Sequence, residues 1–312
     1  MSTITQLEYL LAVDTHRHFA AAAEACNVTQ PTLSMQIKKL EEELGVLVFD
    51  RSKQPVIPTE AGKALLLQAR TVVQQHKKLQ EIADGFKGQI SGELHLGIIP
   101  TLAPYLLPYF AGAFAREYPQ VKLLVQELPT EEIVHRLKKD QLDVGLLVTP
   151  LHDQSISERP LFYEEIKLYI NPQHPLARHQ EVSARQLSQP DMWLLAAGHC
   201  FRSQVLNLCQ QKSAEGELPF RFESGSLETL RRLVETEGGF TLLPELATEE
   251  LPSERQELVH RLAQPRPLRE VSLVYTRHYA KQRLLEALAQ TILEYIPSRL
   301  QRSDRGTVVE WK

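Results

Sequence analysis

The chain has 312 residues, a length that allows two or three compact domains at about 100 to 200 residues each. Its formal net charge of -4 gives no overall basic signature, so composition alone does not indicate a nucleic-acid partner. Three cysteines are too few for the disulfide framework of a small secreted protein, and no apolar stretch approaches the roughly 18 residues of a membrane span. We therefore expect a cytoplasmic protein with no membrane partner, no metal and no cofactor.

The beginning of the chain carries the pattern of three short helices. An amphipathic stretch at 5–12 is followed by an alanine-rich stretch at 19–26. Thr29 can cap a third helix, Pro31 suits its first turn, and apolar residues then recur every three or four positions up to Gly45. The sequence predicts helix, tight turn and helix.

The polar side of the third helix favours DNA binding over an ordinary packed pair of helices. Short hydroxyl and amide groups near a helix start suit base edges and phosphates, and acidic residues occur only at the far end. The next segment, 46–58, alternates apolar and polar residues and predicts a two-stranded wing, whose basic residues contact phosphates or are solvated loop charges. The predicted DNA-contacting residues are Gln30, Pro31, Thr32, Ser34, Gln36 and Lys38 from the helix, and Arg51 and Lys53 from the wing.

A long helix is predicted from Thr59 to about Gly85, with no proline inside it. Its seam positions alternate in steps of four and three, which is typical of a coiled coil and favours a homodimer. Packing of the helix on its own domain is the alternative. The seam residues are Leu65, Ala69, Val72, His76, Leu79 and Ala83.

After a glycine-rich hinge at 85–92, short strands alternate with helices. We expect strands at 94–99, 121–126 and 142–148 and helices at 102–117 and 131–139. Such successive βαβ units form a parallel sheet.

A second run of the same kind follows, and it favours two sheets over one. The expected segments are strands at 165–170, 192–195, 220–223 and 240–243, and helices starting at 201 and 227. A proline-rich segment at 264–267 then precedes a strand at 271–275 and a helix at 281–295, so the chain is expected to cross back and complete the first subdomain.

The sequence thus predicts an α/β protein with four parts. These are a winged helix-turn-helix at 1–58, a linker helix at 59–88, an effector module at 89–300 and a loose tail at 301–312. Within the effector module, subdomain I takes 89–162 and 267–300, and subdomain II takes 163–266.

The first 62 residues resemble the LysR-type regulators. The resemblance rests on Phe19-Ala-Ala-Ala-Ala-Glu24, Thr29-Gln-Pro-Thr-Leu-Ser34, Leu40-Glu-x-Glu-Leu-Gly45, Phe49-x-Arg51 and Thr59-x-Ala-Gly62. It implies a winged helix-turn-helix, a dimerising linker helix and a two-subdomain effector module similar to periplasmic binding proteins. Met35 departs from the pattern, because many relatives carry a basic residue there.

Two cysteines, Cys200 and Cys209, carry the most informative chemistry. Cys200 opens a helix-like segment, so the helix N-terminus and nearby His199 or Arg202 are expected to lower the pKa of its thiol. Cys209 lies beside the apolar stripe of the same segment and is expected to be buried. Nine helical residues rise roughly 13 Å, whereas a disulfide tolerates Cα separations only up to about 7 Å, so the thiols can join only if the helix unwinds. Two unrelated core cysteines are the alternative, and a zinc site would need more ligands.

The segment from Gly198 to Cys209 resembles the redox motif of peroxide-sensing LysR-type regulators. The resemblance implies that hydrogen peroxide oxidises Cys200 and that Cys209 converts the product to a disulfide. Ser203 and Arg221 depart from that pattern, which has aspartate and often histidine at these positions.

The same resemblance implies a peroxide pocket. Thr101 and Thr130 would hold the oxidant, with His199 beside the thiol and Arg269 nearby. A helix N-cap is the alternative role of Thr130, and Arg269 is otherwise a surface residue.

The predicted function is a peroxide-responsive transcription regulator, not an enzyme, that binds pseudo-palindromic DNA as a homodimer or homotetramer. The resemblance also implies RNA polymerase as a partner. Three alternatives stay open. They are a LysR-type regulator of a small organic ligand, for which Cys200→Ser leaves the response unchanged, a thiol peroxidase, and a solute-binding protein.

Overall fold

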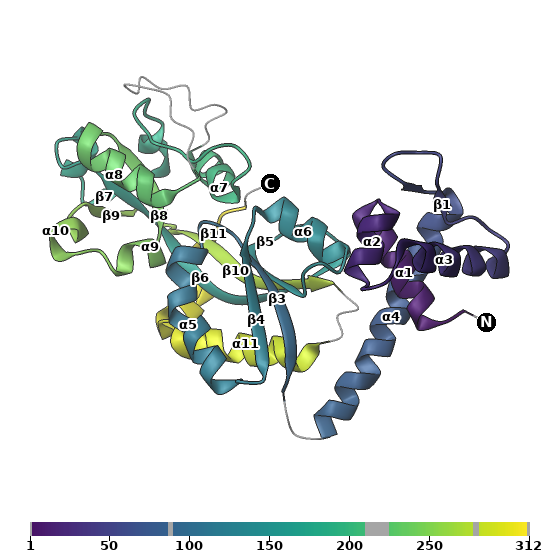
Figure 1. Ribbon diagram of the computed structural model, residues 1–312. Helices are drawn as coiled ribbons and strands as arrows, with labels where there is room; N and C mark the ends of the chain where they lie inside the picture. The colour runs from purple at the N-terminus through teal and green to yellow at the C-terminus, as the bar shows by residue number, and fades with distance from the viewer. Residues whose placement is uncertain (1, 87–89, 210–224, 277–280, 311–312) are drawn as a thin grey trace. The chain divides into compact units, whose positions relative to one another are not determined.

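The computed structural model describes residues 2–86, 90–209, 225–276 and 281–310, and the chain divides into two compact units (Figure 1). The first unit ends at Ile90 and the second begins at Ser91. No helix within the described ranges is long and apolar enough to cross a membrane.

The first unit is the predicted winged helix-turn-helix. Helices α1 (Ile4–His16), α2 (Phe19–Ala25) and α3 (Gln30–Leu44) precede a two-stranded wing of β1 (Phe49–Asp50) and β2 (Ile57–Pro58), which pair antiparallel. Thr29 caps α3 as expected, because its hydroxyl accepts from the backbone N–H of Thr32, and Gly45 ends the helix at φ 72°. The core of the unit is formed by Leu10, Val13, Ala22, Ala23, Leu33, Ile37, Leu40, Val48 and Phe49.

The long helix α4 (Glu60–Phe86) has two different halves. Leu66, Ala69 and Val73 are buried, and Arg70 forms an ion pair with Asp14 of α1, so the first half packs on its own domain. For Ala69 this alternative is right and the predicted seam is wrong, because helix α1 already covers its side chain. Other predicted seam positions are open, since Val72 is 37% and Leu79 is 64% exposed. The side chain of Ala83 lies outside the described part.

The second unit begins with a parallel βαβ arrangement, as predicted. Strands β3 (Gly92–Ile98), β4 (Val121–Glu127) and β5 (Val144–Thr149) are parallel in the order β4-β3-β5, connected by α5 (Ala103–Glu117) and α6 (Thr130–Lys138). Strand β10 (Pro267–Thr276) lies antiparallel beside β5. The chain therefore does cross back to complete this sheet, which is mixed and not purely parallel.

One long strand, β6 (Ile156–Ile170), joins the two halves of the effector module. Its first part pairs with β10, and its last residues pair with β8 (Phe240–Pro244) and β9 (Val259–Leu262), next to β7 (Glu181–Val182). The predicted border at 162/163 thus lies inside a continuous strand, and the expected two separate sheets share it.

Two helices cover the second half of the module, α7 (Cys200–Cys209) and α8 (Leu227–Glu237) (Figure 1). The predicted strand at 192–195 is wrong, since Met192 makes only an isolated bridge to Phe240. The predicted strand at 220–223 lies outside the described residues.

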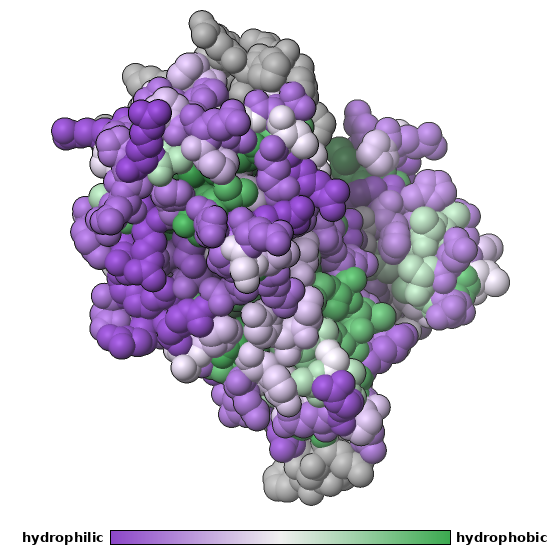
Figure 2. All heavy atoms as spheres, turned by 90° about the vertical axis from the view of Figure 1, so that its left-hand side faces the viewer, coloured by the Kyte–Doolittle hydropathy of each residue, from purple (hydrophilic) through white to green (hydrophobic). Residues whose placement is uncertain are grey.

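Short helices complete this half: η1 (Pro175–Arg178), η2 (Ala184–Leu187), α9 (Leu246–Glu249) and α10 (Ser253–Gln256). Figure 2 shows that the outer surface on this side is mostly hydrophilic, with apolar side chains in small groups.

The C-terminal segment is not the loose tail that the sequence predicted. After α11 (Gln282–Tyr295), the short helices η3 (Ser298–Gln301) and η4 (Ser303–Arg305) lead into β11 (Thr307–Val308), which pairs in parallel with β10. Leu300 is fully buried and Arg305 forms ion pairs with Glu165 and Glu245. Backbone pairing and buried charge therefore fix this segment, although its polar composition suggested a tail.

Candidate functional site

The predicted DNA-reading side of α3 lies opposite its buried side. Leu33, Ile37 and Leu40 are fully buried, so the intervening residues point outward. Exposed or half-buried on that outer side are Gln30, Pro31, Thr32, Ser34, Gln36 and Lys38. Gln36 is partly engaged, because its side-chain oxygen accepts a hydrogen bond of 3.2 Å from the Gln6 amide. The short polar side chains at the start of α3 thus face solvent, and side chains must be exposed in this way to contact the bases and phosphates of DNA.

Arg51 and Glu41 form a structural pair that the sequence did not predict. Glu41 is buried, and its carboxylate accepts hydrogen bonds from the backbone N–H groups of Val48 (2.8 Å) and Phe49 (3.3 Å). The Arg51 guanidinium lies 2.9 Å from that carboxylate, and it also donates to the Ser34 hydroxyl. Arg51 therefore ties the wing to α3, and the exposed remainder of its guanidinium is the part left for a phosphate. Lys53 is exposed.

A hollow of about 580 Å³ lies between the start of α2, the start of α3 and the wing. It contains predicted DNA-contacting residues from both elements, such as Gln30, Ser34 and Lys53. It is also lined by the consecutive residues His16, Arg17 and His18, which the sequence reasoning missed. The signal was present, since three consecutive basic or titratable residues precede the alanine-rich helix.

In the second unit, Cys200 is the first residue of α7 and is buried. Burial raises the pKa of its thiol, while the Thr130 hydroxyl and the positive charge of Arg269 act in the opposite direction. The expected net lowering of this pKa is therefore wrong, because the cost of charging a buried sulfur exceeds the local stabilisation. The resting form at neutral pH is the thiol.

The backbone N–H groups at the start of α7 favour the thiolate, as expected, but the side chains that do so differ from those expected. Burial lowers the pKa of His199, against the effect of Glu127, so this imidazole is neutral and brings no charge to the sulfur. The Arg202 guanidinium donates to the backbone oxygen of Leu195 at 2.6 Å. Arg269 and Thr130 therefore have the role that we expected of His199 and Arg202.

Arg269 is fully buried at the centre of the site, so the surface alternative is wrong. Its Nε donates to Glu164 Oε1 at 2.7 Å, and its other nitrogens donate to the Thr101 hydroxyl (3.2 Å) and the Thr101 carbonyl (3.1 Å). The guanidinium carbon lies 5.4 Å from the centre of the Phe201 ring, next to Cys200 in sequence. Arg269 thus joins the start of α5, strand β6 and the start of α7.

Thr130 lies at the first turn of α6 and is buried. The N-cap alternative is wrong, because Pro129 occupies that position and no side chain caps the helix. Its hydroxyl has no partner of strict hydrogen-bond geometry in the described part of the chain, yet it is close enough to Cys200 to favour the thiolate. A contact of this length still favours the thiolate, since sulfur accepts hydrogen bonds at longer range than oxygen. The structure therefore brings Thr101, Thr130, Cys200 and Arg269 together.

Cys209 is the last residue of α7 and is buried in the apolar core of the second half, as predicted. Burial raises the pKa of its thiol to about 12. Both cysteines are free thiols. They stand at opposite ends of one unbroken ten-residue helix, so the rise between them is roughly 13 Å and exceeds what a disulfide can span.

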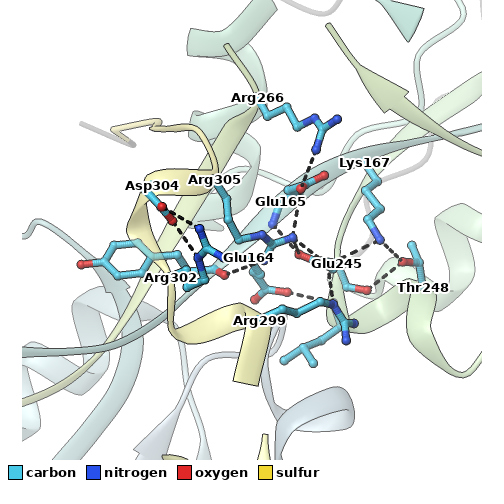
Figure 3. Close-up of polar contacts among 12 residues, drawn as sticks. Glu164, Glu165, Lys167, Glu245, Thr248, Arg266, Arg299, Arg302, Asp304 and Arg305 are labelled. Atoms are coloured by element: carbon cyan, nitrogen blue, oxygen red, sulfur yellow. Dashed lines mark hydrogen bonds and ion pairs between the residues drawn. The ribbon is translucent and has the colours of Figure 1, made fainter. Parts of the chain in front are cut away.

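A cluster of charged side chains lies around Glu164, the buried partner of Arg269 (Figure 3 shows Glu164 and the cluster). The Glu245 carboxylate accepts from the Glu165 backbone N–H at 3.0 Å and lies 2.8 Å from the Arg305 guanidinium. Although burial raises the pKa of Glu245, the Glu165 N–H, Lys167 and Arg305 outweigh it and lower that pKa overall. This cluster could not be predicted from sequence, because its members are far apart along the chain.

No group of three His, Cys, Asp or Glu side chains in the described ranges is arranged to hold a metal ion. Of the two departures from the redox motif, Ser203 lies within α7, and Arg221 lies outside the described residues.

Comparison with protein families defines the class of protein. The model described as "Bacterial regulatory helix-turn-helix protein, lysR family" matches residues 4–63, and the "LysR substrate binding domain" matches residues 87–297. The chain belongs to the LysR family of bacterial helix-turn-helix regulators.

Within that family, the chain is similar over nearly its whole length to OxyR proteins. A "Hydrogen peroxide-inducible genes activator" of Dickeya chrysanthemi is 39% identical over 302 residues, which cover 96% of this chain and 97% of the relative. The "DNA-binding transcriptional dual regulator OxyR" of Escherichia coli K12 is 38% identical over 291 residues, covering 93% and 94%. A full-length OxyR mutant from Pseudomonas aeruginosa has a TM-score of 0.80 at 32% identity, covering 97% of this chain and 98% of that one.

Proposed function

We propose that the chain is a transcription regulator that senses hydrogen peroxide through a reversible disulfide between Cys200 and Cys209. The observation that carries the proposal is the position of the two thiols at the first and last residues of one helix. Because an intact helix keeps them too far apart to bond, disulfide formation requires a change of fold around α7. A chemical signal is thereby converted into a structural one.

The first step takes place at Cys200. The sulfur attacks one peroxide oxygen, the O–O bond breaks as the S–O bond forms, and the departing hydroxide takes up the thiol proton and leaves as water. The product is a sulfenic acid. Arg269 and Thr130 favour the thiolate that reacts, and the Thr101 hydroxyl, which accepts a hydrogen bond from Arg269, would bind the peroxide. His199, being neutral, can relay a proton without net change of charge by taking one up on one ring nitrogen as it releases another from the second.

In the second step the Cys209 sulfur attacks the sulfenic sulfur. The S–S bond forms, the S–O bond breaks, and the hydroxyl leaves with the Cys209 proton as water. Since Cys209 is buried and its pKa is about 12, it is unreactive until α7 opens. A thiol reductant of the glutathione type would restore both thiols and allow α7 to reform.

The response is delivered through DNA. The outward side of α3 and the wing would read a pseudo-palindromic operator as part of a homodimer or homotetramer, and the exposed apolar positions Val72 and Leu79 of α4 support helix pairing. We further propose that RNA polymerase is a partner and that the protein acts in the cytoplasm, where its DNA lies. One peroxide is consumed per response and no product is released for use, so the protein is a sensor and not an enzyme.

Thiol mass spectrometry before and after mild peroxide tests the proposal on wild type and on Cys209→Ser. We expect a peptide linking 200 and 209 in wild type and a trapped sulfenate at Cys200 in the variant. Unmodified thiols in both proteins would overturn the sensing mechanism. A reporter response that survives Cys200→Ser would instead support an organic ligand bound in the effector module.

A further inference from the structure

Residues 307–310, here termed the C-terminal strap, connect strand β10 to helix α7. On one side, the Thr307 N–H donates to the Arg266 carbonyl and the Val309 N–H donates to the Leu268 carbonyl, each at 2.8 Å. These bonds attach the strap immediately before Arg269, the residue whose guanidinium reaches Thr101. The strap is therefore anchored to the strand that carries the centre of the site.

The other side of the strap bonds to the helix between the two cysteines. The Gln204 side-chain amide donates to the Val309 carbonyl at 2.7 Å, and the Asn207 amide donates to the Glu310 carbonyl at 2.9 Å. Gln204 is fully buried, and Val309 packs against the apolar core that contains Cys209. Gln204 and Asn207 are three residues apart, so both reach the strap only while α7 is helical.

We propose that Gln204 and Asn207 are positioning residues that use the strap to hold α7 in its helical form, and thereby set how readily Cys209 reaches oxidised Cys200. The inference rests on the proposed function, because it concerns the second chemical step of the same thiol pair. Unwinding of α7 removes the three-residue spacing and breaks both amide bonds, so the strap stabilises the reduced form and opposes disulfide closure.

The strap is expected to affect only one of the two steps. Transfer of oxygen from peroxide to Cys200 takes place with α7 intact, so sulfenate formation does not depend on the strap. Attack of the Cys209 sulfur on the sulfenic sulfur, with loss of water, needs the unwound segment. A weaker strap therefore accelerates closure and shifts the equilibrium toward the disulfide.

The variant Gln204→Leu tests this with little change to the helix itself. Leucine and glutamine have similar helix propensities, and the substitution also removes a buried Oε1 that has no partner within the described ranges. We expect disulfide closure about tenfold faster than in wild type, and about a tenfold larger disulfide-to-dithiol ratio in a dithiothreitol buffer, as the loss of one buried hydrogen bond predicts. A chain that ends at Val308 should change in the same direction with the sequence of α7 untouched.

Gln301→Leu is the control for the substitution itself, because the Gln301 amide also donates to a backbone carbonyl at 2.7 Å, that of Leu293, in an exposed bond that does not involve α7. It should close at the wild-type rate. Sulfenate formation, measured with Cys209→Ser added to each variant, should also be unchanged. Wild-type closure rates in both Gln204→Leu and the shortened chain, or equal acceleration by Gln301→Leu, would overturn the proposal.

Hydrogen exchange of the reduced protein provides a readout that does not depend on peroxide chemistry. Backbone amides of α7 should exchange faster in Gln204→Leu than in Gln301→Leu, since helix opening no longer breaks the strap contact. Equal exchange rates in the two variants would contradict the proposed role of the strap, even if the thiols proved inert to peroxide. Hydrogen exchange thus tests the role of the strap, whereas thiol mass spectrometry tests the sensing mechanism, and either proposal can fail without the other.

Discussion

Replacing Arg269 by methionine tests the centre of the site most severely. The Arg269 guanidinium and the Glu164 carboxylate both have no exposed surface, and Nε lies 2.7 Å from Oε1. Removing the cation leaves an unpaired buried carboxylate, whose pKa is already raised by burial. Breaking a buried pair from one side typically costs about 3 to 5 kcal/mol, so we expect Arg269→Met to lower the free energy of unfolding of the second unit by that amount.

The assay is urea denaturation of the reduced protein at neutral pH, followed by tryptophan fluorescence, because Trp193 is buried in the same unit. The double variant Arg269→Met/Glu164→Gln separates charge from packing. The double variant should recover at least half of the free energy of unfolding that the single variant loses, since burying a neutral amide costs far less free energy than burying a lone carboxylate. A single variant within about 1 kcal/mol of wild type, or a double variant no more stable than the single one, would refute this reasoning.

Three further predictions concern reactivity, the DNA module and DNA affinity. Because burial raises the pKa of Cys200 above its ordinary value of 9.0, the rate with peroxide should still increase with pH at pH 9, and a stopped-flow plateau below pH 8 would contradict it. Gly62→Ala should unfold the DNA-binding unit at lower temperature, because the new Cβ would lie 2.0 Å from the Val48 carbonyl oxygen, and calorimetry with an unchanged transition would refute this. Lys38→Ala should reduce the slope of log affinity against log salt by about one if Lys38 contacts a phosphate, and an unchanged slope in fluorescence anisotropy would exclude the contact.

The DNA-binding unit could be predicted from the sequence almost completely. Its signals are local, since Thr29 caps the helix that starts beside it, Gly45 ends that helix, and the apolar stripe between them marks the buried side. The role of Glu41 could not be predicted. Its carboxylate turns inward to the wing because the backbone N–H groups of Val48 and Phe49 need an acceptor, a requirement that depends on the tertiary fold.

In the effector module, the thiol pair and its helix could be predicted, but the electrostatics could not. Proximity in sequence pointed to His199 and Arg202 as the groups beside Cys200, whereas burial raises the pKa of the thiol and Thr130 and Arg269, from distant parts of the chain, oppose the rise. The C-terminal segment was missed for the same reason. Its short polar pieces carry little signal, and its order comes from pairing with β10 and from contacts with α7 that only the folded chain creates.

The central claim is that closure of the disulfide requires α7 to unwind. Hydrogen exchange coupled to mass spectrometry, on the reduced protein and on the peroxide-treated protein, measures this directly. We expect the backbone amides between Cys200 and Cys209 to be protected in the reduced form and to lose most of that protection once the linked peptide appears. A protein that contains the linked peptide and keeps the full protection of α7 would contradict the account.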